Sequence, residues 1–124
     1  MERNEITRII IGAAMKFHSA LGPGLLENSY KVCLLHEVLK SGLRAAAEVE
    51  LPLIYDGLKM EVGYKIDLLV EDTVIVELKA VETLLPVHQA QLLCYLKLSG
   101  KQTGLLINFN VVHLRDGIKR MVNG

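Results

Sequence analysis

Three charged residues interrupt two apolar segments that the sequence predicts to be neighbouring strands of a sheet. Asp67 lies within the segment 66–70, and Glu77 and Lys79 lie within 75–80. A carboxylate or an ammonium group on a buried strand costs several kcal/mol unless it is paired, hydrogen-bonded or bound to a metal. These three residues are therefore the first candidates for chemistry in this chain.

The spacing predicts that the three side chains meet. Residues two apart on a strand share a face, so Glu77 and Lys79 point the same way. A tight turn at 71–72 places Asp67 opposite or diagonal to Glu77, with the side chains about 4.5–8 Å apart. Two carboxylates at this separation, with the main-chain carbonyl of Leu78 as a further oxygen, suit a hard cation such as Mg²⁺.

A metal at this position would lower the pKa of a bound water and stabilise charge on a phosphate. The Lys79 ammonium group would then orient the attacking water or offset negative charge. The alternative is a structural ion cluster, in which Lys79 neutralises one of the two acids. The residue types and their spacing leave both interpretations open.

Two further groups of polar residues lie on predicted helices. Glu27 and Tyr30 are three residues apart near the start of one helix, so they share a face. Gln91 and Tyr95 are four residues apart on a later helix and share a face with His88. Each group also has an ordinary explanation. An acid in a first turn is favoured by the helix dipole, and polar residues on a helix often mark the boundary between core and solvent.

The elements that must position these residues follow from hydrophobic periodicity. Helices are predicted from an N-cap at Asn4 to about Leu21, over about 25–40, and from Pro86 to about Leu98. Gly42 suits the position just after the second helix.

Strands are predicted by alternating or continuous apolar residues. They comprise a strand containing Val49, Leu51 and Leu53, then 58–70, 73–81, 104–108 and an edge strand at 118–122. Tyr55-Asp56-Gly57 is a turn signal between the first two. The order α-α-β-β-β-α-β-β predicts an α/β sandwich in which helices flank a central mixed β-sheet.

Composition limits the remaining possibilities. The 124 residues predict one domain over 1–124, and 51% hydrophobic with 23% charged residues exclude a disordered chain. Fourteen basic residues balance fourteen acidic ones, so net charge gives no sign of a nucleic-acid partner. No apolar run reaches the roughly 18 residues of a membrane span, and we expect no signal peptide. Cys33 and Cys94 lie in apolar helical patterns and predict buried free thiols in a reducing cytoplasm.

Taken together, the motifs resemble the PD-(D/E)xK superfamily of restriction-endonuclease-like nucleases, and most closely its small members named for a GxxExxY motif. The matching residues are Gly24, Glu27 and Tyr30, then Asp67 with Glu77-Leu78-Lys79, then Gln91-x-x-x-Tyr95, which resembles a motif of the exonuclease branch of bacterial recombination helicase–nucleases. Ile66 replaces the proline of the superfamily name. The four cysteines that hold an iron–sulfur cluster in some relatives are missing, so we expect no cluster.

The resemblance implies a restriction-endonuclease-like sandwich and a nuclease that hydrolyses DNA or RNA with one or two Mg²⁺ or Mn²⁺ ions. It implies that Asp67, Glu77 and the Leu78 carbonyl hold the metal and that Lys79 is the catalytic lysine. Glu27 would be a further metal ligand or a catalytic acid that orients water.

The same resemblance implies that Gln91 and Tyr95 line the cleft and bind the substrate strand, while Tyr30 packs beneath the site. His88 is a further candidate for a ligand or phosphate contact. DNA is favoured over RNA as the nucleic-acid partner, no membrane is involved, and a homodimer, a helicase or another accessory protein is a possible partner. The alternative is a non-catalytic nucleic-acid-binding or protein-interaction module that keeps the charged cluster as structure.

Overall fold

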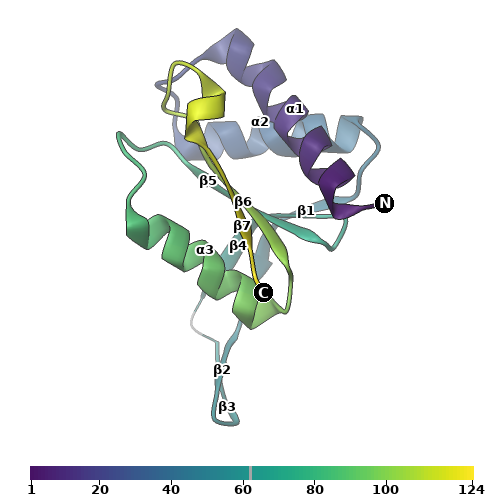
Figure 1. Ribbon diagram of the computed structural model, residues 1–124, viewed down its shortest axis with the longest axis vertical. Coiled ribbons are helices and arrows are strands. Elements are labelled where there is room, and N and C mark those ends of the chain that lie inside the picture. The colour runs from purple at the N-terminus through teal and green to yellow at the C-terminus, as the bar shows by residue number, and fades with distance from the viewer. Residues whose placement is uncertain (62) are drawn as a thin grey trace.

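A five-stranded mixed sheet forms the centre of the structure, a computed structural model that describes residues 1–61 and 63–124 (Figure 1). The strand order is β1-β4-β5-β6-β7, with β5 and β6 parallel and the other neighbours antiparallel. The sheet strands are β1 (Ala45–Glu50), β4 (Lys65–Val70), β5 (Val74–Lys79), β6 (Thr103–Asn108) and β7 (Ile118–Val122). The other elements are helices α1 (Arg3–Leu21), α2 (Glu27–Lys40) and α3 (Pro86–Ser99), a 3₁₀ turn η1 (Leu114–Gly117), and a separate hairpin of β2 (Leu53–Tyr55) and β3 (Leu58–Met60).

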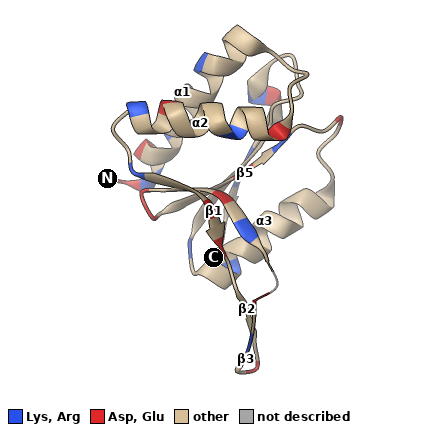
Figure 2. Cartoon of the chain, turned by 180° about the vertical axis from the view of Figure 1, so that it is seen from behind, with Lys and Arg blue, Asp and Glu red and all other residues tan. Residues whose placement is uncertain are grey.

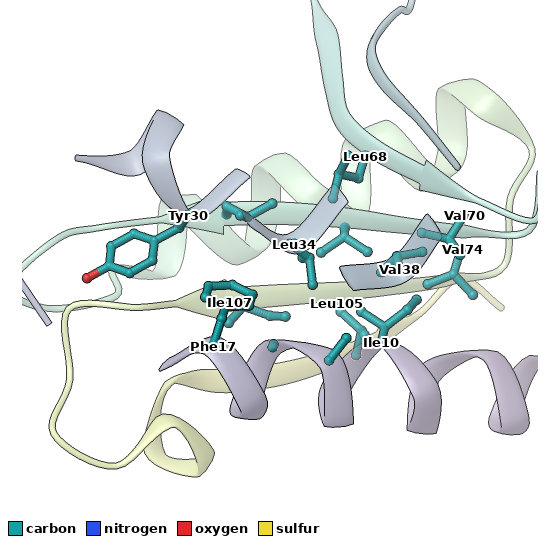
Figure 3. Packing of buried hydrophobic residues seen from close by; sticks show 14 of the residues in the cluster. Ile10, Phe17, Tyr30, Leu34, Val38, Leu68, Val70, Val74, Leu105 and Ile107 are labelled. Carbon is teal, nitrogen blue, oxygen red and sulfur yellow. The ribbon is translucent and has the colours of Figure 1, made fainter. Parts of the chain in front are cut away.

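The helices form two layers, α1 and α2 over one face of the sheet and α3 over the other (Figure 1). Alternate residues of β5 separate into the two cores, since Val76 packs with α1 and α2 whereas Ile75 packs with α3. Figure 3 shows the larger core, in which Leu34 and Val38 of α2 meet the sheet. The all-buried pattern of β6 and the nearly all-buried pattern of β5 show that these two strands are covered on both faces, whereas β4 alternates between buried and more exposed residues.

An aromatic cluster fixes where α2 begins. The ring of Tyr30 is fully buried and stacks on Phe109, with ring centroids 4.7 Å apart. Its hydroxyl donates a hydrogen bond to the carbonyl of Gly22 (2.6 Å) and accepts one from the N–H of Leu25 (3.1 Å). Gly24 has φ +102°, which a side chain would strain. These contacts hold the segment before α2 outside the helix.

The structure corrects two predicted helix starts. The N-cap of α1 is Glu2 and not Asn4, whose side chain instead accepts a hydrogen bond from Arg120. The second helix begins at Glu27, two residues later than predicted, because Leu26 before it is extended. The third helix agrees with the prediction to within one residue at its C-terminus.

The predicted element order describes the five-stranded sheet but lacks the hairpin of β2 and β3. The expected first strand divides into β1, which ends at Glu50, and β2, which begins at Leu53. Between them lies Pro52, which cannot donate a main-chain hydrogen bond. The expected strand over 58–70 also divides between β3 and β4, and its residue Val62 lies outside the described residues. The turn at Tyr55-Asp56-Gly57 therefore belongs to a hairpin that projects away from the sheet (Figure 1).

Surface features agree with the balanced composition. In Figure 2, acidic and basic residues are interspersed over helices, strands and the hairpin. No helix among the described residues combines the length and apolar character needed to cross a membrane. Both cysteines are free, but Cys94 is exposed and Cys33 only half-buried, so the prediction of buried thiols was wrong. Helical periodicity alone did not separate the core-facing side of α3 from its outer side.

Replacing Tyr30 by phenylalanine tests the role of its hydroxyl group. The ring stacking remains, but the Gly22 carbonyl and the Leu25 N–H lose their partner, which is expected to lower the free energy of unfolding by about 1–3 kcal/mol. Urea denaturation measures the loss. The matched control is Tyr55→Phe, an exposed tyrosine of the hairpin, for which we expect a change within about 0.5 kcal/mol. Equal stability of the two variants would contradict this role.

Candidate active site

The two strands that carry the charged residues separate where Asp67 and Glu77 face each other. The paired residues of β4 and β5 run from Val70↔Val74 to Leu68↔Val76, which places Asp67 directly opposite Glu77. The Asp67 N–H donates to Glu77 Oε1 (3.1 Å), and the Leu78 N–H donates to Asp67 Oδ2 (2.9 Å). Each carboxylate thus takes the place of a main-chain carbonyl of the opposite strand. We call Asp67 and Glu77 the carboxylate pair.

Glu77 occupies the most unfavourable position for negative charge in this group. The residue is only 5% exposed to solvent. Burial, followed by the charge of Asp67, raises the pKa of Glu77 to about 8, although the hydrogen bond from the Asp67 N–H and the charge of Lys79 act in the opposite direction. A cation placed between the two carboxylates would relieve this repulsion.

Glu27 and Lys79 approach the carboxylate pair from different elements. Glu27 is the first residue of α2, and its pKa is raised by burial and then by the charge of Asp67, while Lys79 and Lys31 lower it. Lys79 is half-buried at the end of β5, and among the described residues no carboxylate lies within 4 Å of its ammonium group. Its charge is therefore available to a ligand.

Asn108 fixes the end of the strand that carries Lys79. Its buried side chain donates to the Val81 carbonyl (2.9 Å) and accepts hydrogen bonds from the N–H groups of Val81 (3.0 Å) and Asn110 (3.2 Å). The Phe109 N–H donates to the Lys79 carbonyl (2.9 Å). The main chain on both sides of Lys79 is thus held in place.

The third helix brings Gln91 and Tyr95 to the same region from the other layer. The Tyr95 hydroxyl accepts a hydrogen bond from the Gln91 side chain (3.2 Å). Burial raises the pKa of Tyr95, and the charges of Glu77 and Asp67 raise it further. His88 also lies on α3, where its Nδ1 accepts the Leu85 N–H (2.9 Å) and caps the start of the helix.

Sequence reasoning missed two charged residues at this site. Lys31 forms an ion pair with Glu48, and its Nζ lies 3.7 Å from Asp67 Oδ1. Glu48 lies on β1 between the positions paired with Leu68 and Ile66, directly across from Asp67, and has φ +55°, uncommon outside glycine. Lys31 could have been found, because it follows Glu27 by four residues and shares its helix face. The backbone conformation of Glu48 left no signal in the sequence.

The donor atoms available here suit a hard divalent cation. Among the described residues, no three His, Cys, Asp or Glu side chains lie close enough together to hold a metal, so Glu27 is not part of a preformed cage. The donors are the carboxylate pair and the Leu78 carbonyl, which points to the same side of β5 as the Leu78 N–H bonded to Asp67. All are oxygens, as Mg²⁺ prefers, and Mg²⁺ usually completes its shell with water.

A mixed β-sheet flanked by helices, with an acid on one strand and Glu-x-Lys on the neighbouring strand, defines a nuclease-like class of domain. The family model described as the PD-(D/E)XK nuclease superfamily matches residues 4–121, and the chain belongs to this superfamily. This membership confirms the superfamily resemblance and the restriction-endonuclease-like fold, and it implies a nucleic-acid substrate. No curated protein and no solved structure matches the chain significantly.

The raised pKa of Glu77 predicts that this residue destabilises the metal-free protein at neutral and alkaline pH. An acid whose pKa is higher in the folded state than its ordinary 4.5 does not lower the free energy of unfolding below pH 4.5. Above pH 4.5 the loss of stability grows until about pH 8. Glu77→Gln, which can still accept the Asp67 N–H, is therefore expected to be more stable than the unsubstituted protein by a few kcal/mol at pH 8 in EDTA.

Thermal unfolding at pH 5 and pH 8 measures this difference, which should shrink at the lower pH. Glu82→Gln, at an exposed position after β5, serves as the control and should change little at either pH. A stabilisation by Glu77→Gln that is equal at both pH values would show that repulsion within the carboxylate pair is not its source.

Proposed function

We propose that this chain, as a single domain over 1–124, is a nuclease of the GxxExxY group that hydrolyses phosphodiester bonds with Mg²⁺ or Mn²⁺. The observation that carries the proposal is the carboxylate pair, buried between two strands and adjacent to Lys79, a lysine with no carboxylate within 4 Å among the described residues. Repulsion between two carboxylates held this way gives a strong affinity for a cation. Membership of the superfamily supports the same activity.

In this proposal Asp67, Glu77 and the Leu78 carbonyl hold the metal, and Glu27 contributes through a bound water. The metal, when bound, supplies Lewis-acid stabilisation of the charge on the phosphate. Lys31 is a positioning residue, because its ammonium group lies 3.7 Å from Asp67 Oδ1 while Oδ2 accepts the Leu78 N–H. The carboxylate is thus oriented from both oxygens, and its remaining lone pairs would bind the cation.

The chain's own residues then account for the chemistry. The Lys79 ammonium group orients a water for in-line attack and offsets the negative charge that develops on the phosphate. The oxygen of that water forms the new bond to phosphorus, and the bond from phosphorus to the leaving ester oxygen breaks. One proton of the attacking water passes to the leaving oxygen, either directly or through solvent. Glu27 accepts a hydrogen bond from the same water, and Gln91 and Tyr95 contact the scissile strand.

The proposal extends to the substrate and the setting. DNA is the favoured polymer, and the cytoplasm is the favoured compartment because both cysteines are free. A chain with zero net charge makes few phosphate contacts of its own. A second copy, a helicase or another accessory protein would supply further contacts.

Cleavage assays with labelled single- and double-stranded DNA and RNA test the activity. We expect cleavage with Mg²⁺ or Mn²⁺, none with EDTA, and a loss of at least about 100-fold in Lys79→Ala and Asp67→Asn. Lys40→Ala, at the exposed end of α2, is the matched control and should retain activity. If the protein cleaves no polymer, the chain is better explained as a non-catalytic binding module. If both site variants cleave as well as the unsubstituted protein does, the assignment of catalysis to this site is wrong.

Metal binding is tested separately from activity by calorimetric titration with Mn²⁺. Asp67→Asn removes one of the two charges that attract the cation and is expected to weaken binding by about 10-fold or more. Lys79→Ala removes no donor atom, so it should bind Mn²⁺ at least as tightly as the unsubstituted protein. Unchanged affinity in Asp67→Asn would place the cation elsewhere.

A further inference from the structure

An apolar groove of about 620 Å³ lies along α3, outside the carboxylate pair. Pockets of about 300–1,000 Å³ bind small organic molecules or parts of larger ones. Most of the lining is apolar or aromatic, and six of its residues are Leu53, Tyr64, Val87, Cys94, Tyr95 and Leu98. We call it the α3 groove. Of these six residues, Tyr95 alone has a part in the proposed hydrolysis.

Tyr95 links the α3 groove to the candidate active site. Gln91 and Tyr95 both line the groove and are hydrogen-bonded to each other, and Tyr95 lies near enough to the carboxylate pair for the charges of Glu77 and Asp67 to act on it. Inside the groove, the ring of Tyr95 lies beside that of Tyr64, with centroids 6.1 Å apart and planes tilted by 54°. A ligand that extends from the carboxylate pair past Tyr95 therefore enters a groove that holds two phenol rings.

We propose that the α3 groove binds one unpaired nucleobase next to the scissile phosphate, so that the substrate is single-stranded or locally unpaired nucleic acid. This inference rests on the proposed function. A flat heterocycle with apolar faces suits a groove with aromatic walls, since every base can stack on such rings. The Gln91 amide and the His88 side chain are polar groups of the same lining that can bond to a base edge.

A base inside a continuous duplex cannot enter the α3 groove. Its faces are covered by neighbouring bases and its edge is paired, so it must first be flipped out, at a cost in unstacking and unpairing that single strands largely avoid. The position of the groove therefore selects against paired substrate. The same apolar lining could instead accept a side chain of a protein partner, including a second copy of this chain, and the experiment separates these occupants.

The experiment measures binding of fluorescein-labelled single-stranded DNA by anisotropy in the Lys79→Ala background with Mg²⁺. The oligonucleotides form a series in which a single abasic site moves along an otherwise constant sequence. We expect one position at which loss of the base weakens binding by about 10-fold, whereas the fully paired duplex binds more weakly than the intact single strand. Equal affinities across the series would overturn the proposal.

Substitutions in the α3 groove test whether the dependence of binding on one base arises there. Cys94→Trp fills the groove from an exposed position and should remove both the affinity for the intact strand and its dependence on the abasic site. Cys94→Ser keeps the space and should retain both, and Leu39→Trp adds an exposed tryptophan to α2, away from the groove. If Cys94→Trp does not fold, Ala90→Phe at the rim replaces it. Unchanged DNA binding in a folded, groove-filled variant overturns the proposal, and a changed oligomeric state with it points to a second copy.

Cleavage assays distinguish failure of this inference from failure of the proposed function. If intact duplex and single strand are cleaved equally and the abasic series has no effect, the base site is overturned and the nuclease stands. If no polymer is cleaved but one base controls binding through the α3 groove, the base site is supported and the nuclease fails.

Discussion

The structure depends on one constraint, the placing of two carboxylates opposite each other in a largely buried position. Asp67 and Glu77 each accept an N–H from the opposite strand, and these bonds replace part of the ladder between β4 and β5. The bonds hold both groups in place without cancelling their charge, since burial and repulsion still raise the pKa of Glu77. A fold that maintains this cost in its centre is not organised for stability alone, and the proposed cation would relieve the cost.

Each neighbouring element contributes by placing one group beside this pair. The stacking of Tyr30 on Phe109 and its bonds to the preceding segment set the start of α2, and so bring Glu27 and Lys31 to one side. Asn108 holds the end of β5 in place through its side-chain hydrogen bonds to the main chain of Val81. The start of α2 and the end of β5 are thus held by the neutral side chains of Tyr30 and Asn108, whose polar atoms are hydrogen-bonded.

Local patterns predicted the site better than they predicted the strands. Residue spacing predicted that Asp67 lies opposite or diagonal to Glu77. The three-residue turn 71–73, between the paired residues Val70 and Val74, places it opposite. The same alternation did not show that segments within 49–70 belong to two different sheets, since pairing is decided by contacts between distant residues. The part played by Glu48 was also hidden, since this residue has a left-handed backbone conformation that its residue type does not predict.

The hairpin of β2 and β3 interrupts the chain between two strands that pair with each other, and it forms no part of their sheet (Figure 1). The register of β1 and β4 is therefore independent of the length and sequence of the segment between them. Long insertions at such surface connections cost little loop entropy. This segment can accordingly diverge between related chains and reshape the outer surface near α3, while the residues proposed to perform hydrolysis keep their positions. In this architecture, the surface that would select the substrate can therefore change without a change in the residues proposed for the chemistry.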